Sequence, residues 1–457
     1  MKYQIQKLKY SAALKNTPNK FLNIHSLNDF KVLSFYYKYL KNIQWIRIFC
    51  IQSYFVFVKF YFIVFNNILN KKEDNYKLIN MKDFALKHKL KKSILFKRTL
   101  TKYLTPYVLT ENLKNIKNFT AKNFITSEDV YLIKIKDANV IGQSNIIFAN
   151  QNAVHHDLLN FKLDYTFEET HNIFSIAVNK GEVNIPLKFY NRAYIDEAAS
   201  FVDAVANNYA HWTTEILPRI VAFCKDSKYK NVPLILNDSL HRNIMRSMDF
   251  IVGSRNIILL RKNHLIQVKN LYLISAAGFV AFERRNLAKP ESSTGSYNNL
   301  AVKFLRKKFL SAPIDNKKKW PEKIFIRRNS HYRKLINSKE IEELLIKKGF
   351  AIVEPGNLSF ENQVALFSNA KTIIGPAGAD FANLIYANLK SNVIILVSDH
   401  EGNNYEYWPN ISSLIGIQIT YILGRCVEPR LTGRWGLHSD FSINLKFLDE
   451  SISRIGE

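Results

Sequence analysis

Cysteine is scarce in this sequence, and its scarcity argues against a disulfide framework. The 457 residues include only three cysteines, Cys50, Cys224 and Cys426, and no Cys-x-x-Cys pair occurs. An odd number of widely separated cysteines is typical of proteins that work in a reducing compartment. We therefore expect ordinary buried thiols and a cytoplasmic protein.

Long apolar runs are also missing. Residues 1–7 lack the apolar run of a signal peptide. Residues 43–69 form the only membrane-like stretch, but Arg47 and Lys59 interrupt it and leave 11 uncharged residues between them. A membrane-spanning helix needs about 20 apolar residues in a row. We interpret the stretch either as an interfacial helix or as the core helix of a small N-terminal bundle.

Acidic residues are few relative to basic ones, and the imbalance is local. The chain has 65 Lys and Arg against 38 Asp and Glu, a net charge of +27. Residues 1–120 contain 23 basic and 5 acidic side chains, whereas the rest of the chain is nearly balanced. Such a segment suits an anionic membrane surface, although compositional drift explains it equally well. No zinc-finger spacing or aromatic RNA-binding motif accompanies it, so we expect no nucleic-acid partner.

Clustered metal ligands are missing as well. No Asp-x-Asp occurs anywhere, although proteins that hold Mg²⁺ or Mn²⁺ typically use closely spaced carboxylates. His155 and His156 are adjacent, but they would not share a helical face, and no third ligand is near them in the sequence. We predict no metal site and no metal cofactor.

Alternating strand and helix patterns are present from residue 183 onward. The predicted strands include 232–236, 257–260, 270–274, 323–326, 350–353, 371–374 and 393–397. The predicted helices include 203–221, 241–251, 298–310, 337–348, 359–369 and 379–387. Asn337 with Glu340 looks like a capping box, and Ser359 looks like a helix cap. Alternation at this spacing predicts an α/β fold with parallel, doubly wound sheets.

The chain divides into three predicted segments. Residues 1–122 would be a basic, helical N-terminal extension suited to attachment at a membrane surface, with 71–117 Lys-rich and helix-like. Residues 123–318 would be a first α/β domain that starts with short strands at 130–135, 140–142 and 146–148, with turn signals between them. Residues 319–457 would be a second α/β domain, because the lysine run and proline at 317–321 make the best linker. Two such domains would face a cleft.

The most unusual local cluster lies in residues 207–219. His211, Trp212, Glu215 and Arg219 fall within nine residues. A spacing of four puts His211 and Glu215 on one face of a helix, whereas Trp212 would point towards a core or a sugar-sized face. A lone histidine is more often structural than catalytic, so the rest of the chain must decide between these two readings.

Two loops at the carboxyl ends of predicted strands suit a phosphate. Arg327, Arg328 and Arg333 follow strand 323–326, and guanidinium groups bind phosphate oxygens bidentately. The loop 375–380 opens a helix with glycines, which allow close backbone approach to an anion. The arginine loop alone could be a solvated basic turn. Together the two loops predict a nucleotide-diphosphate cradle, with arginines and a helix N-terminus neutralising the charge in place of a metal.

Four segments in this order resemble glycosyltransferase family 61, a group formerly described as capsular-polysaccharide-type proteins of unknown function. They are residues 208–219, 326–337, 349–363 and 374–383, and the similarity covers about residues 125–425. The resemblance implies a GT-B-like fold of two Rossmann-type domains, acceptor-side at 123–318 and donor-side at 319–457. It also implies an inverting, metal-independent hexosyl- or pentosyltransferase.

The resemblance further implies the reactants and the setting. The donor would be a nucleotide sugar, commonly a UDP-sugar, acting as co-substrate. The acceptor would be a glycan or a lipid-linked acceptor in the synthesis of a surface polysaccharide such as capsule or lipopolysaccharide, at the inner face of the cytoplasmic membrane. One departure is Ala377, where family members often have His. It leaves open a catalytically silent protein that binds sugar nucleotides or glycans.

The resemblance and the loop chemistry together assign roles. His211 would be the catalytic base, with Glu215 either orienting it or acting as the base, and Asp380 is a third candidate. Glu361 would bind ribose hydroxyls. The residues on the nucleotide-sugar side would be Arg327, Arg328, Arg333, Glu361, Gly375, Gly378, Ala379 and Asn383. The residues on the acceptor side would be Asn208, Trp212 and Arg219.

Overall fold

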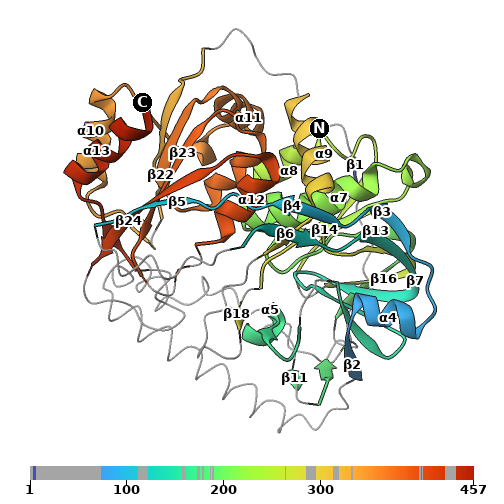
Figure 1. Cartoon of the computed structure of the whole chain (residues 1–457). Coiled ribbons are helices and arrows are strands. Elements are labelled where there is room, and N and C mark those ends of the chain that lie inside the picture. The colour runs from blue at the N-terminus through green and yellow to red at the C-terminus, as the bar shows by residue number, and fades with distance from the viewer. Residues whose placement is uncertain are drawn as a thin grey trace, which may run out of the picture.

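The computed structural model contains two large sheets with helices packed around and between them (Figure 1). It describes residues 4–6, 74–111, 122–156, 160–171, 175–177, 180–185, 187, 190–262, 264–281, 283–284, 295–311, 319–330, 333–400, 403, 405–427 and 439–456. The interfacial or core helix expected at 43–69 lies outside these residues. No helix within them is long and apolar enough to cross a membrane.

The first sheet has 12 strands, and its parallel part fixes the position of the residues that follow it. The order is β15 (Asn256–Leu260), β14 (Leu234–Asn237), β13 (Asn191–Ser200) and β16 (His264–Ile274), all parallel. Numbered along the chain, this order is 3-2-1-4. The order reverses between β13 and β16, and ligands of such sheets bind beyond the carboxyl ends at that switch point.

The rest of the first sheet is mostly antiparallel. β7 (Val130–Ile141) pairs with β16 and is one continuous strand, although two short strands with a turn were predicted there. Asp137, which lies between the first two predicted strands, is accommodated inside β7 with a positive φ of 50°. The remaining strands are β1 (Gln4–Gln6), β2 (Asp74–Asn80), β3 (Ser93–Phe96), β8 (Ile146–Ala149), β9 (Asn152–His155), β11 (Ser175–Ala177) and β12 (Glu182–Ile185).

The second sheet matches the predicted doubly wound pattern. Its parallel strands run in the order β21 (Ala351–Val353), β20 (Lys323–Ile326), β22 (Thr372–Pro376), β23 (Asn392–Ser398) and β24 (Ile419–Cys426). This is 2-1-3-4-5 along the chain, so its switch point lies between β20 and β22. Apolar side chains fill these strands because helices cover both faces of such a sheet.

Helices connect the strands, and small pairs of strands complete the fold. The helices of the first half are α4 (Met81–Lys87), α5 (Phe167–Thr170), α6 (Tyr209–His211), α7 (Leu217–Cys224), α8 (Arg242–Met248) and α9 (Asn299–Leu310). Those of the second half are α10 (Ser338–Lys347), α11 (Phe360–Asn369), the 3-10 helix η8 (Ala379–Tyr386), α12 (Tyr407–Ile415) and α13 (Leu445–Gly456). The small strands are β10 (Asp164–Tyr165), β17 (Gly278–Phe279), β18 (Glu283–Arg284), β19 (Ser296–Tyr297) and β25 (Phe441–Ser442).

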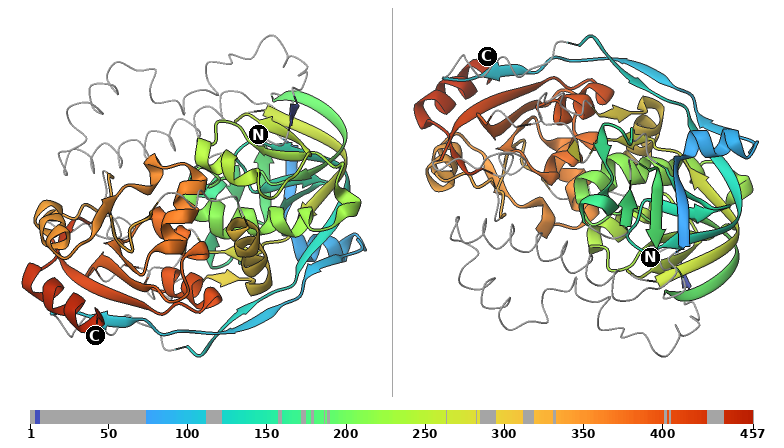
Figure 2. Two further views of the ribbon diagram at one scale, coloured as in Figure 1. Left: turned by 90° about the horizontal axis from the view of Figure 1, so that it is seen from above. Right: turned by 90° about the horizontal axis from the view of Figure 1, so that it is seen from below.

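Residues 74–111 contain four strands and only one short helix, so the prediction of a helical extension is wrong for this part. β2 and β3 join the first sheet, whereas β5 (Tyr107–Leu109) pairs with β24 of the second. Between them, β4 (Thr99–Lys102) pairs with β6 (Phe124–Ser127). Figure 2 shows this blue segment running along the edge of the molecule from one sheet to the other. The high lysine content hid the period-two alternation of these strands, whose lysines point outward.

One hydrophobic core is shared by the helices of both sheets. Buried side chains of α7, α9, α11, α12 and η8 belong to a single cluster that reaches strands of both sheets. The ring of Phe309 in α9, for example, packs 4.9 Å from Phe360 and 5.9 Å from Tyr386, measured between centroids. The two halves of the molecule are therefore joined by buried apolar surface as well as by the chain.

The two helix caps predicted in the second half have different outcomes. Ser359 caps α11 as expected, because its Oγ accepts from the Asn362 amide at 3.2 Å. The capping box at Asn337 is wrong. Its side chain makes no cap bond, and instead donates to the carbonyl of Ile443 at 2.7 Å and accepts from its amide at 3.1 Å. The side-chain amide of Asn337 therefore bonds the backbone of Ile443, just after β25, and is not used for a helix cap.

Candidate functional site

The predicted cluster at 207–219 lies directly after β13, at the switch point of the first sheet. Asn208 begins α6 by accepting from the Ala210 amide at 3.0 Å, so this predicted acceptor residue acts as a helix cap. Pro218 has no N–H to donate to the turn before it. The chain widens there into a π-helix, η5 (Trp212–Ile216), in which the Leu217 amide bonds the Trp212 carbonyl. Single π turns of this kind are frequent at functional sites.

A close backbone approach holds this widened turn. A Cβ atom on Gly278 would lie only 2.3 Å from the Thr214 carbonyl oxygen, so no larger residue fits where β17 passes η5. Gly278 follows β16, the second strand of the same switch point. Both loops of the switch point therefore meet at the π-helix.

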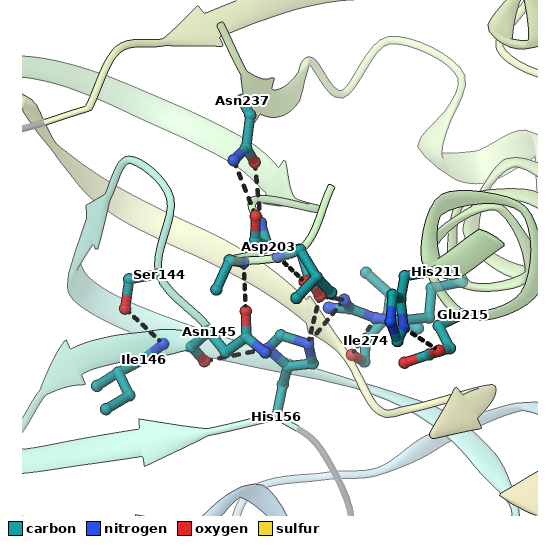
Figure 3. Close-up of polar contacts among 12 residues, drawn as sticks. Ser144, Asn145, Ile146, His156, Asp203, His211, Glu215, Asn237 and Ile274 are labelled. Atoms are coloured by element: carbon teal, nitrogen blue, oxygen red, sulfur yellow. Dashed lines mark hydrogen bonds and ion pairs between the residues drawn. The ribbon is translucent and has the colours of Figure 1, made fainter. Parts of the chain in front are cut away.

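His211 and Glu215 form the pair that their spacing predicts. The His211 Nδ1 atom lies 2.6 Å from Glu215 Oε1 (Figure 3), with side chains 20% and 12% exposed. An ionised carboxylate can only accept, so Nδ1 carries the hydrogen and donates it. The Nε2 lone pair is then the basic position of the imidazole. The arrangement can take a proton from a hydroxyl and balance the resulting imidazolium with the Glu215 charge.

Tyr407 is a neighbour of this pair that the sequence analysis missed. Its ring lies edge-on to His211, with centroids 6.4 Å apart, and its hydroxyl is 3.4 Å from Thr214 Oγ1. Burial, and then the negative charge of Glu215, raises the pKa of Tyr407 well above its ordinary value, so the hydroxyl stays neutral. No motif surrounds Tyr407 in the sequence. Only the packing of α12 against η5 brings it here.

Trp212 is not positioned to stack on a sugar, which corrects its predicted role. Its side chain is 0% exposed, and its Nε1 donates to Ser247 Oγ at 3.0 Å. The indole belongs to the hydrophobic core shared by the two halves. Of the two readings left open for Trp212, the core position is confirmed.

Arg219 is also buried, so its predicted contact with an acceptor is wrong in this structure. Its Nε donates to the Ile274 carbonyl at 3.3 Å, and its Nη1 lies 2.8 Å from His156 Nε2. A guanidinium has no acceptor atom, so His156 Nε2 must accept and the imidazole is neutral. Its Nδ1 then donates to the Asn145 carbonyl at 3.1 Å. Asp203 balances the buried charge from 3.7 Å.

This buried network anchors the loop that carries His211 (Figure 3). The Asp203 amide donates to Asn237 Oδ1 at 2.9 Å, and Asn237 Nδ2 returns a bond to the Asp203 carbonyl at 2.8 Å. The Ala204 amide donates to Asn145 Oδ1 at 2.6 Å. Sequence analysis missed Asp203 and Asn237. Their position as polar residues at the carboxyl ends of buried strands could have identified them. Their role is to fix the loop that leads into α6.

Arg327 and Arg328 point to opposite sides of the second sheet because adjacent residues alternate along a strand. Arg327 forms a fork with Glu342, at 2.9 and 2.5 Å, and contacts Glu354 at 3.2 Å. Its guanidinium is thus held by carboxylates, which disfavours the predicted contact with a diphosphate. Arg328 turns inward and donates from Nη1 to the Ala377 carbonyl at 2.6 Å.

Arg328 and Arg333 are the paired cations of the second switch point. Burial, and then the positive charge of Arg333, lowers the pKa of Arg328 to about 10, with Asp380 acting against both. Burial also lowers the pKa of Arg333, which takes a positive φ of 52°. The Nε atoms of both arginines are buried and have no partner among the described residues. Buried donors of like charge without a partner suit an anion.

The glycine loop at the end of β22 packs against Arg328. A Cβ atom on Gly378 would lie 2.5 Å from Arg328 Nη1, and one on Gly375 would lie 2.8 Å from Ile326 Cβ. Gly375 is therefore required for close packing against Ile326, whereas a Cβ atom on Gly378 would displace the guanidinium end of Arg328. Ala379 begins η8, which is a 3-10 helix where an ordinary helix was expected. Its side chain is half-buried.

Asp380 lies between the two halves of the candidate site. Burial raises its pKa above the ordinary value, and the positive charge of Arg328 opposes the rise. Its carboxylate also contributes to the raised pKa of Tyr209, after the larger effect of burial. Tyr209 is two residues before His211. The charge of Asp380 therefore interacts with Arg328 on one side and with Tyr209, at the start of α6, on the other.

Asn383 joins the two sheets and does not face a donor as predicted. Tyr209 donates its hydroxyl to Asn383 Oδ1 at 2.6 Å, and Tyr386 donates to the same oxygen. Asn383 Nδ2 donates to Gln363 Oε1 at 3.0 Å. Tyr209 follows β13 and Asn383 follows β22, so this buried network brings the carboxyl ends of the two sheets together. The His211–Glu215 pair and the arginine pair consequently belong to one region.

Glu361 has a structural partner where ribose binding was predicted. Its Oε1 lies 2.5 Å from Arg246 Nη2, and Arg246 also contacts Asp249. This ion pair connects α11 with α8. Within the described ranges, no three His, Cys, Asp or Glu side chains are grouped closely enough to hold a metal ion.

Residues 209–394 match the model of a protein family described as Glycosyltransferase 61. The match begins at Tyr209 in α6 and ends in β23, so it contains the His211–Glu215 pair, the arginine pair and Asp380. Tyr407 and everything before Tyr209 lie outside it. No curated protein matches the chain.

The raised pKa of Asp380 predicts how stability depends on pH. The folded state binds this proton more tightly than the unfolded state, so the contribution of Asp380 to stability is full below the ordinary pKa of 3.8 and is lost as pH rises. Asp380→Asn should therefore raise the melting temperature at neutral pH, and the gain should shrink as the pH falls below 3.8. Thermal unfolding across this range measures it.

Asp226→Asn is the control with the opposite sign. A hydrogen bond from Lys228 lowers the pKa of Asp226, so its contribution to stability is present above the ordinary pKa and is lost in acid. This variant should melt at a lower temperature than wild type at neutral pH. A lower melting temperature for Asp380→Asn at neutral pH would contradict the account of Asp380.

Proposed function

We propose, from the premise that this chain is a glycosyltransferase of family 61, that it moves a sugar from a nucleotide-sugar donor to an acceptor hydroxyl with inversion and without a metal. The observation that carries the proposal is the meeting of two switch points, one with the His211–Glu215 pair and one with the Arg328–Arg333 pair. The two α/β halves would then work as a GT-B-like pair, with the first on the acceptor side and the second on the donor side.

The acceptor side supplies the base. The acceptor oxygen attacks the anomeric carbon while its proton passes to His211 Nε2, and Glu215 stabilises the imidazolium that forms. Attack from the face opposite the leaving group inverts the anomeric centre. Asp380 is the alternative base, because a raised pKa makes a carboxylate a better proton acceptor near neutrality.

The donor side stabilises the leaving group. The bond between the anomeric carbon and the diphosphate oxygen breaks, and the electron pair leaves with the nucleoside diphosphate. The buried, partnerless Nε donors of Arg328 and Arg333 support a role for these side chains in holding the developing charge. Gly378 keeps the backbone of the loop close to Arg328, and Gly375 packs the loop against Ile326. Two guanidinium groups would do the work that a divalent metal does in other enzymes.

The donor, the acceptor and the setting are the next part of the proposal. A UDP-sugar donor, a glycan or lipid-linked acceptor and a place in surface polysaccharide synthesis are carried by the resemblance to the family. Work in the cytoplasm is supported by the small number of scattered cysteines.

Replacement of the base tests the acceptor side. His211→Gln should lower the rate of UDP release from UDP-sugars in the presence of acceptor by about 10²–10⁴-fold, while UDP still binds. Glu215→Gln should lower it less and move the pH optimum, because the imidazolium loses its counter-charge. His171→Gln, an exposed histidine in the first half, should behave as wild type.

The outcomes separate the alternatives. A wild-type rate in His211→Gln with a lost rate in Asp380→Asn would assign the base to Asp380. Equal background rates for wild type and every variant, across the donor panel, would show a silent binding protein, the reading suggested by Ala377.

Adjacent arginines give a matched test of the donor side. Arg328→Gln and Arg333→Gln should each weaken UDP binding about tenfold to a hundredfold, the range expected for a lost charged hydrogen bond. Arg327→Gln should leave binding within about twofold, because Glu342 and Glu354 already hold that side chain. Calorimetric titration with UDP measures all three. Equal losses for Arg327 and Arg328 would mean that the sheet does not separate them as described.

A further inference from the structure

The ribbon formed by β4 and β6 exposes apolar side chains beside basic ones. Leu100 and Phe124 are 65% and 53% exposed, and Lys102 lies directly opposite Phe124 in the pairing. The alternate residues Thr101 and Ile125 point inward and are buried. The outward face of the ribbon is therefore apolar and positively charged, and Lys97 and Arg98 extend the charge at its start.

Helix α9 packs against the inward side of the ribbon, and its own exposed stripe has the same chemistry. The Asn299 amide donates to Thr99 Oγ1 at 3.1 Å, and Asn299 Nδ2 donates to Thr101 Oγ1 at 2.9 Å. The exposed stripe of α9 has a spacing of three and four residues. It consists of Leu300, Lys303, Lys307 and Leu310. The helix contains no acidic residue.

We call these side chains the ribbon–helix surface. It consists of Lys97, Arg98, Leu100, Lys102, Phe124, Leu300, Lys303, Lys307 and Leu310. Glu128 and Asp129 are the nearest acids along the ribbon, and the Asp129 carboxylate accepts from the backbone amide of Arg98. Figure 2 shows the ribbon at the outer edge of the molecule. Exposed leucines are ordinary when single, but four large apolar side chains within a basic surface fit an interface.

The chemistry of this surface selects its partner. Lysines are attracted to the negative headgroups of an anionic bilayer, and leucine and phenylalanine gain by burial at the boundary of the acyl chains. A nucleic acid would bind the lysines, but its bases stack on aromatic rings and would gain little from three exposed leucines. The combination of side chains therefore favours a membrane.

We propose that the ribbon–helix surface docks the protein on an anionic membrane surface. This surface is distinct from residues 43–69, where the sequence predicted membrane attachment and which lie outside the described residues. It does not depend on the proposed transfer reaction.

Vesicle co-sedimentation of the full chain tests the proposal. The vesicles would be phosphatidylcholine alone or phosphatidylcholine mixed with phosphatidylglycerol. Wild type should bind the anionic vesicles and lose binding at high salt. The pair Leu100→Ser with Phe124→Ser, and the pair Lys303→Gln with Lys307→Gln, should each weaken that binding by at least about tenfold.

A matched control changes two apolar side chains that are similarly exposed but lie outside the ribbon–helix surface. Ile346→Ser with Leu389→Ser changes two similarly exposed apolar residues of the second half and should bind like wild type. Unchanged vesicle binding in both surface pairs would overturn the proposal, as would equal losses in the control pair. Wild type that ignores vesicles but binds single-stranded RNA through the same lysines would overturn it in favour of a nucleic-acid surface. UDP binding, measured without vesicles, should be unchanged in every variant, so a failure here is separate from a failure of the transferase proposal.

Discussion

The hydrogen bond from Tyr209 to Asn383 is the contact on which the candidate site depends. Each sheet alone would supply half of the proposed chemistry, a base after β13 or a pair of cations after β20. The Tyr209–Asn383 bond, with Tyr386 and Gln363 behind it, holds the two carboxyl edges against each other. These groups are buried, so losing one partner would leave others unsatisfied, which costs more than an exposed hydrogen bond is worth.

The need to hold the two carboxyl edges together explains why several of the predicted site residues have structural roles. Arg219 and Asp203 fix the loop before α6, Trp212 fills the core beneath it, and Glu361 ties α11 to α8. A site assembled from two sheets needs both rims to be held rigidly, because a general base must stay within hydrogen-bond reach of its substrate. The residues that touch substrate are then few, and most of the polar cluster supports them.

Sequence reasoning located the elements of the second half and the two loops at its switch point, because strand–helix alternation and glycine placement are local signals. It also found the His211–Glu215 pair, whose four-residue spacing fixes the contact. It failed where the outcome depends on distant neighbours. Asn337 has a stronger partner in Ile443, and Arg327 and Arg328 separate only once the strand's orientation is known. Tyr407 lies in no recognisable motif. In residues 74–111 the high lysine content concealed the alternation that would have indicated strands.

The central claim is that His211 and the arginine pair border one binding site. Proton–carbon NMR of protein labelled at its histidines tests it directly, with the His211 signal identified from His211→Gln. Addition of UDP should shift the His211 imidazole signal in wild type, and the shift should be lost in Arg328→Gln at the same UDP concentration. Saturating UDP binding, seen by calorimetry, with an unmoved His211 signal would contradict the claim.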